Sequence, residues 1–285
     1  MNNTHSGAVV VGYDGSPDAK RALSWAESFA RTKHRPLRVL VATADTRLRQ
    51  LTELDQDWER LRISDLEADA RQSVAGLDLG DVDLVTVEAG PAPALIMGVD
   101  HSSVLVLGSR GHGRVADAFV GSVSQHVTRH APCPVVVVRE SSNPDAKRVV
   151  VGVDGSVGAE PALEFAFDFA GSFLAPLTAI HVLQSTSPGP PYASRFVSDW
   201  YTRAVSAVEP VVGESLAKYA EKFPDVEVTR EVVAGTVGRV LSDASEQAAL
   251  LVVGSRGRGA FTSLLLGSVG QSVLNHARCP VVVAR

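Results

Sequence analysis

The chain contains the same sequence pattern twice, and this internal repeat restricts its fold more than any other feature. The first copy opens with VVVGYDGSPDAKRALSWAESFA at residues 9–30, and the second opens with VVVGVDGSVGAEPALEFAFDFA at residues 149–170. A later pair of segments, at residues 104–139 and 250–285, also aligns without a gap. The repeat period is about half of the 285 residues, so the pattern predicts two tandem domains and not the short units of a solenoid.

Composition and charge exclude several classes of protein. The chain is 45% hydrophobic and 21% charged, which is typical of a soluble globular protein. Its formal net charge of −5 argues against a nucleic-acid partner held by bulk electrostatics. No apolar run is long enough to cross a bilayer, and the start lacks a signal-peptide pattern, so we expect a cytoplasmic protein without a membrane partner.

The two cysteines, Cys133 and Cys279, occupy equivalent positions in the repeat, within APCPVVVV and ARCPVVVA. We interpret them as small apolar residues at the entry to the last strand of each half. A disulfide between them stays an alternative, because its geometry cannot be read from sequence.

Each half alternates β-branched runs with helical patterns. Strands are predicted at residues 8–13, 37–43, 82–88, 104–109 and 135–139, and again at 149–153, 177–183, 226–233, 250–255 and 281–284. Several of them are apolar at consecutive positions, which is typical of parallel strands covered on both faces. The pattern predicts an α/β fold of two tandem flavodoxin/Rossmann-like domains, each an open five-stranded parallel sheet in the order 3-2-1-4-5 with helices on both faces. Because residues 141–147 are polar and contain a proline, we place the domains at 1–141 and 147–285.

Two serines are predicted to begin equivalent helices. Ser16 followed by Pro17 is typical of an N-cap and a first helical residue, and Ser156 occupies the same place in the second half. The long helical segment that includes Tyr219 contains Pro210, which predicts a kink or a break.

A glycine-rich segment with arginines follows the fourth predicted strand of each half. In the first half it comprises Gly108, Ser109, Arg110, Gly111, His112, Gly113 and Arg114, followed by Gly121 and Ser122. In the second half it comprises Gly254, Ser255, Arg256, Gly257, Arg258 and Gly259, followed by Gly267, Ser268 and Val269.

This loop-to-helix arrangement is typical of a phosphate-binding site. Glycines let the main chain approach a ligand closely. Ser122 and Ser268 are expected at helix N-termini, where unpaired amides and the helix dipole favour an anion, and the nearby arginines add positive charge. The alternative is an ordinary glycine turn with a serine cap, but two copies with identical glycine spacing favour a binding site. The common nucleotide fingerprints GxxxxGK[ST] and GxGxxG are absent.

An aspartate follows the first strand of each half, at Asp14 after Gly12 and at Asp154 after Gly152. It has two interpretations. The carboxylate can shape the strand-to-helix loop as an Asx turn. It can also accept a hydrogen bond from a ligand or coordinate a phosphate-bound cation such as Mg²⁺. In the strand order 3-2-1-4-5 the first and fourth strands are neighbours, so we expect each aspartate to lie beside the glycine loop of its half, where ligands bind in such sheets.

The spacing Gly-x2-Gly-x9-Gly-Ser, present in both halves together with the VVVGxDGS opening, resembles the ATP-binding signature of the universal stress protein family. The resemblance covers essentially the whole chain as two family domains. It implies two bound ATP per chain, with Mg²⁺ accompanying the triphosphate. Main-chain groups around Ala42 and Val182 would hold adenine, and Gly108 and Gly254 would lie by the ribose. The remaining glycines and Ser122 and Ser268 would surround the phosphates, and the two aspartates would lie near the ribose or phosphates.

The resemblance also implies an assembly and a role. The two halves would pair through residues 135–138 and 281–283 as a pseudo-dimer within one chain, and a homodimer of chains stays open. The expected function is that of an ATP-binding regulator or sensor in stress adaptation, with an unidentified protein partner and slow or absent hydrolysis.

One alternative is an ATP-using enzyme, either an ATPase or a phosphoryl or adenylyl transferase, for which His112 is the best catalytic candidate. Its counterpart is Arg258, which cannot act as a base at neutral pH, so catalysis in both halves is not expected. The other alternative, an interaction module that has lost nucleotide binding, disagrees with the intact motifs.

Overall fold

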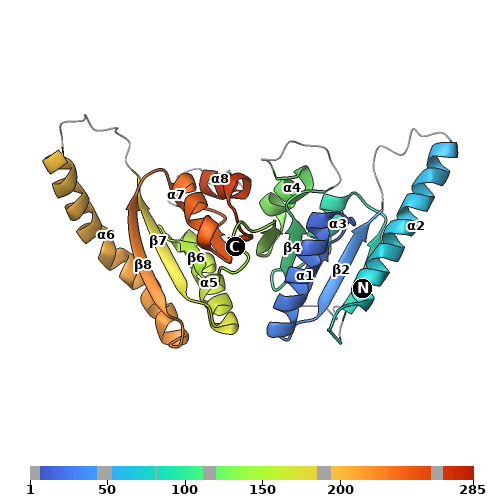
Figure 1. The fold of residues 1–285 in the computed structure, drawn as a ribbon, viewed down its shortest axis with the longest axis horizontal. Coiled ribbons are helices and arrows are strands. Elements are labelled where there is room, and N and C mark those ends of the chain that lie inside the picture. The colour runs from blue at the N-terminus through green and yellow to red at the C-terminus, as the bar shows by residue number, and fades with distance from the viewer. Residues whose placement is uncertain (1–6, 44–52, 81, 112–119, 185–193, 258–265) are drawn as a thin grey trace. The chain divides into compact units, whose positions relative to one another are not determined.

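The chain divides into two compact units, Met1–Glu140 (unit 1) and Ser141–Arg285 (unit 2). The computed structural model describes residues 7–43, 53–80, 82–111, 120–184, 194–257 and 266–285. Both units alternate strands and helices along the chain (Figure 1). The predicted pairing of the two halves through their last strands stays a prediction.

Unit 1 is a doubly wound α/β domain. Its elements are β1 (Val9–Gly12), α1 (Pro17–Thr32), β2 (Leu37–Ala42), α2 (Glu53–Ala75), β3 (Val82–Val87), α3 (Pro91–Met97), β4 (Val104–Gly108), α4 (Ser122–His130) and β5 (Val135–Val138). The strands lie in the order β3-β2-β1-β4-β5, and neighbouring strands are parallel. Helix α3 contacts α4, and a hydrogen bond from Lys20 to Asp69 joins α1 to α2.

Unit 2 repeats this arrangement. Its elements are β6 (Val149–Gly152), the short 3-10 helix η2 (Val157–Ala159), α5 (Glu160–Phe173), β7 (Leu177–Leu183), α6 (Ser194–Lys222), β8 (Val228–Ala234), α7 (Val237–Ala244), the 3-10 helix η3 (Ser245–Gln247), β9 (Leu250–Gly254), α8 (Ser268–His276) and β10 (Val281–Ala284). The order β8-β7-β6-β9-β10 is again parallel throughout. Helices α5 and α6 contact each other, as do α7 and α8. The predicted fold class and strand order are therefore confirmed in both units.

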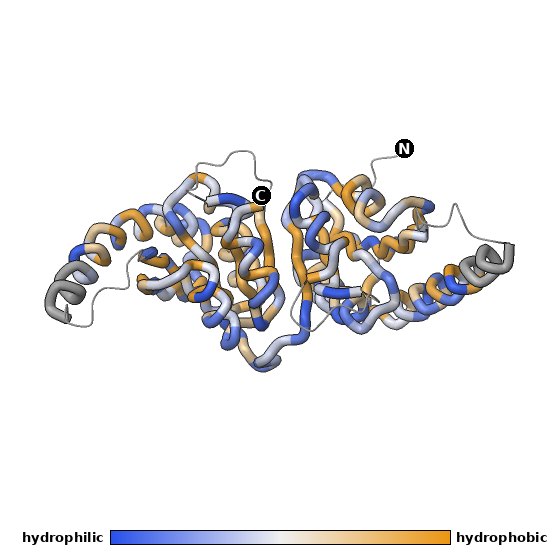
Figure 2. The backbone as a smooth tube through the Cα atoms, turned by 90° about the horizontal axis from the view of Figure 1, so that it is seen from above, coloured by the Kyte–Doolittle hydropathy of each residue, from blue (hydrophilic) through white to orange (hydrophobic). Residues whose placement is uncertain are grey.

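The first strand of each unit lies at the centre of its core. Val9 pairs with both Leu37 and Val104, and Val149 pairs with both Leu177 and Leu250. Residues 9–11 and 149–151 are at most 1% exposed. Figure 2 shows hydrophobic and hydrophilic stretches that alternate along the chain of each unit. Consecutive apolar residues form these strands because helices cover both faces of each sheet.

The helix starts and the proline of α6 agree only in part with the sequence prediction. Ser16 caps α1 as predicted, since its side chain accepts a hydrogen bond from the Ala19 amide at 3.1 Å. Ser156 precedes a 3-10 turn and makes no such cap bond, so its predicted capping role is wrong. A break at Pro210 is also wrong: α6 continues through this residue, because a proline removes only one of many helical hydrogen bonds.

Cys133 and Cys279 are both fully buried and form no disulfide, which confirms their interpretation as apolar packing residues. Of the helices in the part of the chain that the structure describes, none combines the length and apolar character of a membrane span.

Candidate functional site

The loops after the first and fourth strands meet at the carboxyl edge of each sheet. In unit 1, β1 and β4 are paired neighbours, so both loops leave the sheet side by side. A Cβ atom added to Gly111 would lie 2.5 Å from Asp14 Oδ2. In unit 2, a Cβ on Gly257 would lie 2.7 Å from Asp154 Oδ2. Each carboxylate therefore lies in space that stays open because the loop residue beside it is glycine.

Each aspartate also shapes its own turn. The Ser16 amide donates to Asp14 Oδ1 at 3.0 Å, and the Ser156 amide donates to Asp154 Oδ1 at 2.9 Å. The intervening Gly15 has a φ of +79°, a left-handed conformation that favours glycine. The Asx-turn interpretation is thus correct, and it involves Oδ1, whereas Oδ2 lies beside the glycine loop. One carboxylate can serve both the turn and a ligand.

The segment after each glycine loop begins a helix with a glycine cap. Gly121 is the N-cap of α4 and makes no side-chain cap bond, while its amide donates to the Ser109 carbonyl at 2.8 Å. Gly267 does the same before α8, donating to the Ser255 carbonyl at 2.9 Å. Ser122 and Ser268 are the first helical residues and are exposed, so the alternative of a serine cap is wrong. The amides of a first helical turn have no partner within the helix and can bind an anion.

Several predicted glycines have a packing reason for being glycine. A Cβ on Gly108 would lie 2.7 Å from the main-chain carbon of Asp18, and one on Gly254 would lie 2.6 Å from the Gly158 carbonyl oxygen. A Cβ on Gly12 would lie 2.7 Å from a methyl group of Leu107. These glycines let helices and side chains pack closely against the strand ends next to the candidate site.

The remaining predicted residues are only partly described. Ala42 ends β2, and Val182 is the second-last residue of β7, so both lie near the carboxyl edge of their sheets. Ser109 and Ser255 are buried, Arg110 is half-buried and Arg256 is exposed. Gly152 ends β6, and Val269 follows Ser268 in the first turn of α8. His112, Gly113, Arg114, Arg258 and Gly259 lie outside the described residues.

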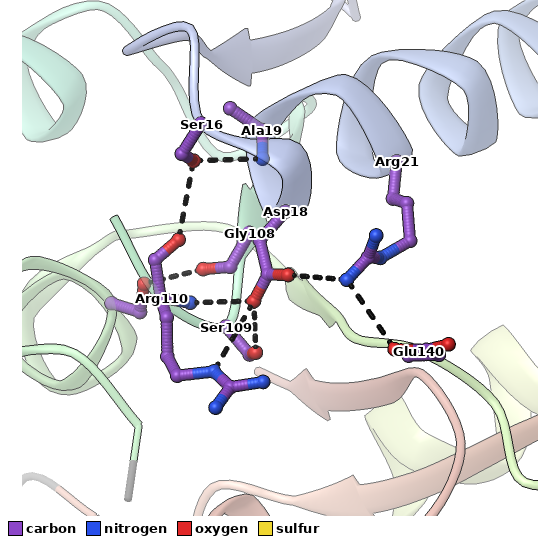
Figure 3. A network of polar contacts seen from close by, with 9 residues as sticks. Ser16, Asp18, Ala19, Arg21, Gly108, Ser109, Arg110 and Glu140 are labelled. Carbon is purple, nitrogen blue, oxygen red and sulfur yellow. Dashed lines mark hydrogen bonds and ion pairs between the residues drawn. The ribbon is translucent and has the colours of Figure 1, made fainter. Parts of the chain in front are cut away.

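Sequence reasoning missed Asp18, the second residue of α1, which contacts the glycine loop of unit 1 (Figure 3). Its carboxylate is 7% exposed and accepts hydrogen bonds from the Ser109 hydroxyl at 2.6 Å and the Arg110 amide at 3.0 Å. An acidic residue in the first turn of a helix is common, so it gives little signal by itself. The available signal was the difference between the repeats, because Gly158 stands at the equivalent position.

A buried histidine lies near the edge of unit 2, where the sequence analysis expected only main-chain groups to take part. His181 lies on β7 beside Val182, and its Nδ1 donates to the Val153 carbonyl at 2.8 Å. This bond places the proton of a neutral ring on Nδ1. Val41 occupies the equivalent position in unit 1.

Tyr13, Lys20 and Asp69 form a hydrogen-bond network with shifted pKa values next to the Asp14 turn of unit 1. The Tyr13 hydroxyl donates to Asp69 Oδ2 at 2.5 Å, and Lys20 donates to the other oxygen at 2.8 Å. Burial raises the pKa of Tyr13, and the Asp69 hydrogen bond adds to the rise. The hydrogen bond from Lys20 lowers the pKa of Asp69. This network joins α2 to the residue directly before Asp14.

A surface groove in unit 2 lies between the start of α5 and the end of α6. It is lined by residues that include Glu160, Glu164, Lys218 and Lys222. Its charges pair across the groove, with Lys218 at 3.0 Å from Glu160 and Lys222 at 3.2 Å from Glu164. We therefore place the candidate site at the glycine loops, next to the first turns of α4 and α8.

The fold and the two loops define a tandem α/β protein with the same candidate site repeated at the carboxyl edge of each sheet. The model of the Universal stress protein family matches residues 6–139 and again residues 146–285. The Universal stress protein Rv2623 of Mycobacterium tuberculosis H37Rv is 35% identical, over 97% of this chain and 96% of that protein. Universal stress protein Rv2005c of the same strain is 33% identical over the same shares of the two chains.

Solved structures agree with these sequence relatives. The crystal structure of a universal stress protein from Archaeoglobus fulgidus DSM 4304 has a TM-score of 0.68, with 23% identity over 99% of this chain and 97% of that one. A putative universal stress protein from Pseudomonas aeruginosa UCBPP-PA14 has a TM-score of 0.62 and 16% identity, over 98% and 92% of the two chains. The chain belongs to the universal stress protein family and contains two of its domains in tandem.

Proposed function

We propose that each unit binds one ATP at the carboxyl edge of its sheet, and that the chain acts as a nucleotide-dependent regulator of stress adaptation in the cytoplasm. The observation that carries the proposal is the repeated contact between an aspartate and a glycine loop, Asp14 with Gly111 and Asp154 with Gly257. Both pairs lie where a ligand binds in a sheet of this strand order. Membership of the universal stress protein family supports the role in stress adaptation.

The groups around the loop match the parts of ATP. The first amides of α4 and α8 would receive phosphate oxygens, because the helix dipole and unpaired N–H groups favour negative charge there. Arg110 and Arg256 follow the first loop serine of each unit and add positive charge. The exposed Asp14 carboxylate would accept a hydrogen bond from a ribose hydroxyl. The main chain at Ala42 and Val182 would receive the adenine edge.

A magnesium ion fits this arrangement only together with the nucleotide. Among the described residues, no group of three or more His, Cys, Asp or Glu side chains is placed to hold a metal ion. Mg²⁺ in proteins is commonly held by one or two carboxylates together with phosphate oxygens and water. Asp14 and Asp154 are the residues that would contribute a carboxylate oxygen to such an ion. The ion would neutralise phosphate charge when bound.

The enzyme alternative is supported by no described residue. Its catalytic candidate, His112, lies outside the described part of the chain. The carboxylates that lie by the loops each serve a turn through one oxygen, which suits binding better than proton transfer. We therefore propose regulation by nucleotide binding, with a protein partner that senses the bound state.

Titration calorimetry of the full chain with ATP and magnesium chloride tests the proposal. We expect binding with a stoichiometry of one ATP for each unit. The changes Asp14→Ala and Asp154→Ala should each remove about half of the heat, and together they should abolish binding. Asp100→Ala is the matched control, because this carboxylate accepts several hydrogen bonds at the opposite end of β4. The absence of measurable ATP binding by the unaltered chain would refute the proposal.

A further inference from the structure

The two glycine loops differ in how the rest of their unit holds them before any ligand is bound. Asp18 and Ser124 flank the loop of unit 1, and the repeat places Gly158 and Gly270 at the equivalent positions of unit 2. The side chains of Asp18 and Ser124, which hold the loop from α1 and α4, are therefore missing from the second copy. The glycine spacing of the loops themselves is identical.

Asp18 joins the loop of unit 1 to helix α1 through Oδ2, while Oδ1 bonds to Arg21 of the same helix (Figure 3). Oδ2 accepts from the Ser109 hydroxyl at 2.6 Å and from the Arg110 amide at 3.0 Å, and Arg110 Nε lies 3.7 Å away. Oδ1 accepts from Arg21 Nη2 at 2.8 Å. The carboxylate is 7% exposed, so water screens these charge-assisted bonds only weakly.

Two further side chains hold the same segment. The Ser124 hydroxyl donates to the Gly108 carbonyl at 2.7 Å, and the Ser16 hydroxyl lies 3.4 Å from the Arg110 carbonyl, to which it donates. Residues 108–110 are therefore attached on one side to the first turn of α1 and on the other to the first turn of α4. Both turns also form the edge at which the ligand is proposed to bind.

In unit 2, the serine that corresponds to Ser16 donates to a different acceptor. The Ser156 hydroxyl donates to Asp154 Oδ1 at 2.6 Å, within its own turn. Gly158 and Gly270 have no side chain to reach the loop. The close approach of the Gly158 carbonyl to Gly254 is a packing contact, and it supplies no acceptor with the charge of a carboxylate. Among the residues that the structure describes, the loop of unit 2 therefore has no counterpart of the Asp18 attachment in unit 1.

This difference has a thermodynamic consequence for binding. A segment that is already ordered loses less conformational entropy when a ligand binds, so pre-organisation increases affinity. The negative charge of Asp18 does not oppose an anionic ligand strongly, because Arg21 and Arg110 lie beside it and Asp18 points away from solvent. We therefore expect Asp18 to increase affinity by ordering the loop more than it lowers affinity by repelling an anionic ligand.

We propose that Asp18 is a positioning residue that fixes the glycine loop of unit 1 before the ligand arrives, so that unit 1 binds nucleotide more tightly than unit 2 and fills first. The identity of the ligand rests on the proposed function above. The ordering of the loop does not, because it is a property of the ligand-free chain.

Amide hydrogen exchange of the ligand-free full chain tests the ordering. The Arg110 amide donates to Asp18, whereas Gly158 offers the Arg256 amide no carboxylate, so we expect Arg110 to exchange at least about tenfold more slowly. Asp18→Ala should remove this difference, and Asp18→Asn should retain part of it, since an amide oxygen can still accept from Arg110. Asp100→Ala, at the other end of β4, should leave the difference unchanged.

Calorimetry of the same variants with ATP and magnesium chloride tests the affinity. Asp18→Ala should weaken the tighter site about tenfold and leave the weaker site unaltered. Equal exchange of the Arg110 and Arg256 amides in the unaltered chain would overturn the proposal, and so would two ATP sites of equal affinity in the unaltered chain. If the unaltered chain binds no ATP, the proposed function and the order of filling both fail, while the exchange rates still decide whether Asp18 fixes the loop.

Discussion

Alanine replacement of two glycines in the same loop is predicted to affect different properties. One replacement should mainly lower ATP affinity, and the other should mainly lower the free energy of unfolding. A Cβ at position 111 would lie 2.5 Å from Asp14 Oδ2, which is the far end of a flexible and exposed side chain. A Cβ at position 108 would lie 2.7 Å from the Asp18 main-chain carbon and 2.9 Å from the Ala19 amide nitrogen. The first neighbour can move away, whereas the second is main chain in the first turn of α1.

The magnitudes follow from what must move. In Gly111→Ala the Asp14 carboxylate rotates away, which costs its bond to the Ser16 amide, about 0.5–1 kcal/mol of the free energy of unfolding. The new methyl group then occupies the place proposed for the ligand, so ATP affinity in unit 1 should fall about 10- to 100-fold. In Gly108→Ala the overpacked helix start should cost about 1–3 kcal/mol. At about 2–4 °C per kcal/mol, the Tm of unit 1 should fall by up to about 12 °C.

Two measurements on each variant separate these effects. Differential scanning calorimetry gives the Tm, and titration with ATP and magnesium chloride gives the affinity of each site. Gly257→Ala is the matched comparison in unit 2, where the new Cβ would lie 2.7 Å from Asp154 Oδ2. A Gly111→Ala chain that keeps full ATP affinity, or a Gly108→Ala chain that keeps its Tm, would show that the reasoning from these distances is wrong.

Further predictions concern the helix start and the network behind it. Ser16→Ala should lower the free energy of unfolding by about 1 kcal/mol because it removes the cap bond to the Ala19 amide, whereas Ser156→Ala, which removes no cap, should cost clearly less in urea titration. Tyr13→Phe should cost about 1 kcal/mol at neutral pH through the lost bond to Asp69. The raised pKa of Tyr13 means that its contribution is complete below its ordinary value of 10.0 and is lost as the pH rises through the folded-state pKa, so Tyr13→Phe should flatten the alkaline fall in stability. The lowered pKa of Asp69 means that its contribution is present above its ordinary value of 3.8 and is lost as the pH falls further, so Asp69→Asn should flatten the acid fall in stability.

Much of the fold could be predicted because the evidence for it is local. Runs of consecutive apolar residues identify strands that are covered on both faces, and the limits of β7 and β10 agree with those predicted. The alternation of strand and helix then leaves few allowed strand orders. Given that order, the meeting of Asp14 with Gly111 follows from parallel strands ending at one edge.

The sequence by itself therefore determined the tandem repeat, the doubly wound sheets and the place where the two loops converge. Only the tertiary structure decided how each loop is held: that Ser16 caps its helix while Ser156 bonds to Asp154, and that Asp18 holds Ser109 from 91 residues away. The physical reason is that hydrophobic periodicity reports on a residue's immediate surroundings along the chain. The partner of a buried carboxylate depends on which distant main-chain and side-chain donors the folded sheet brings within hydrogen-bond distance.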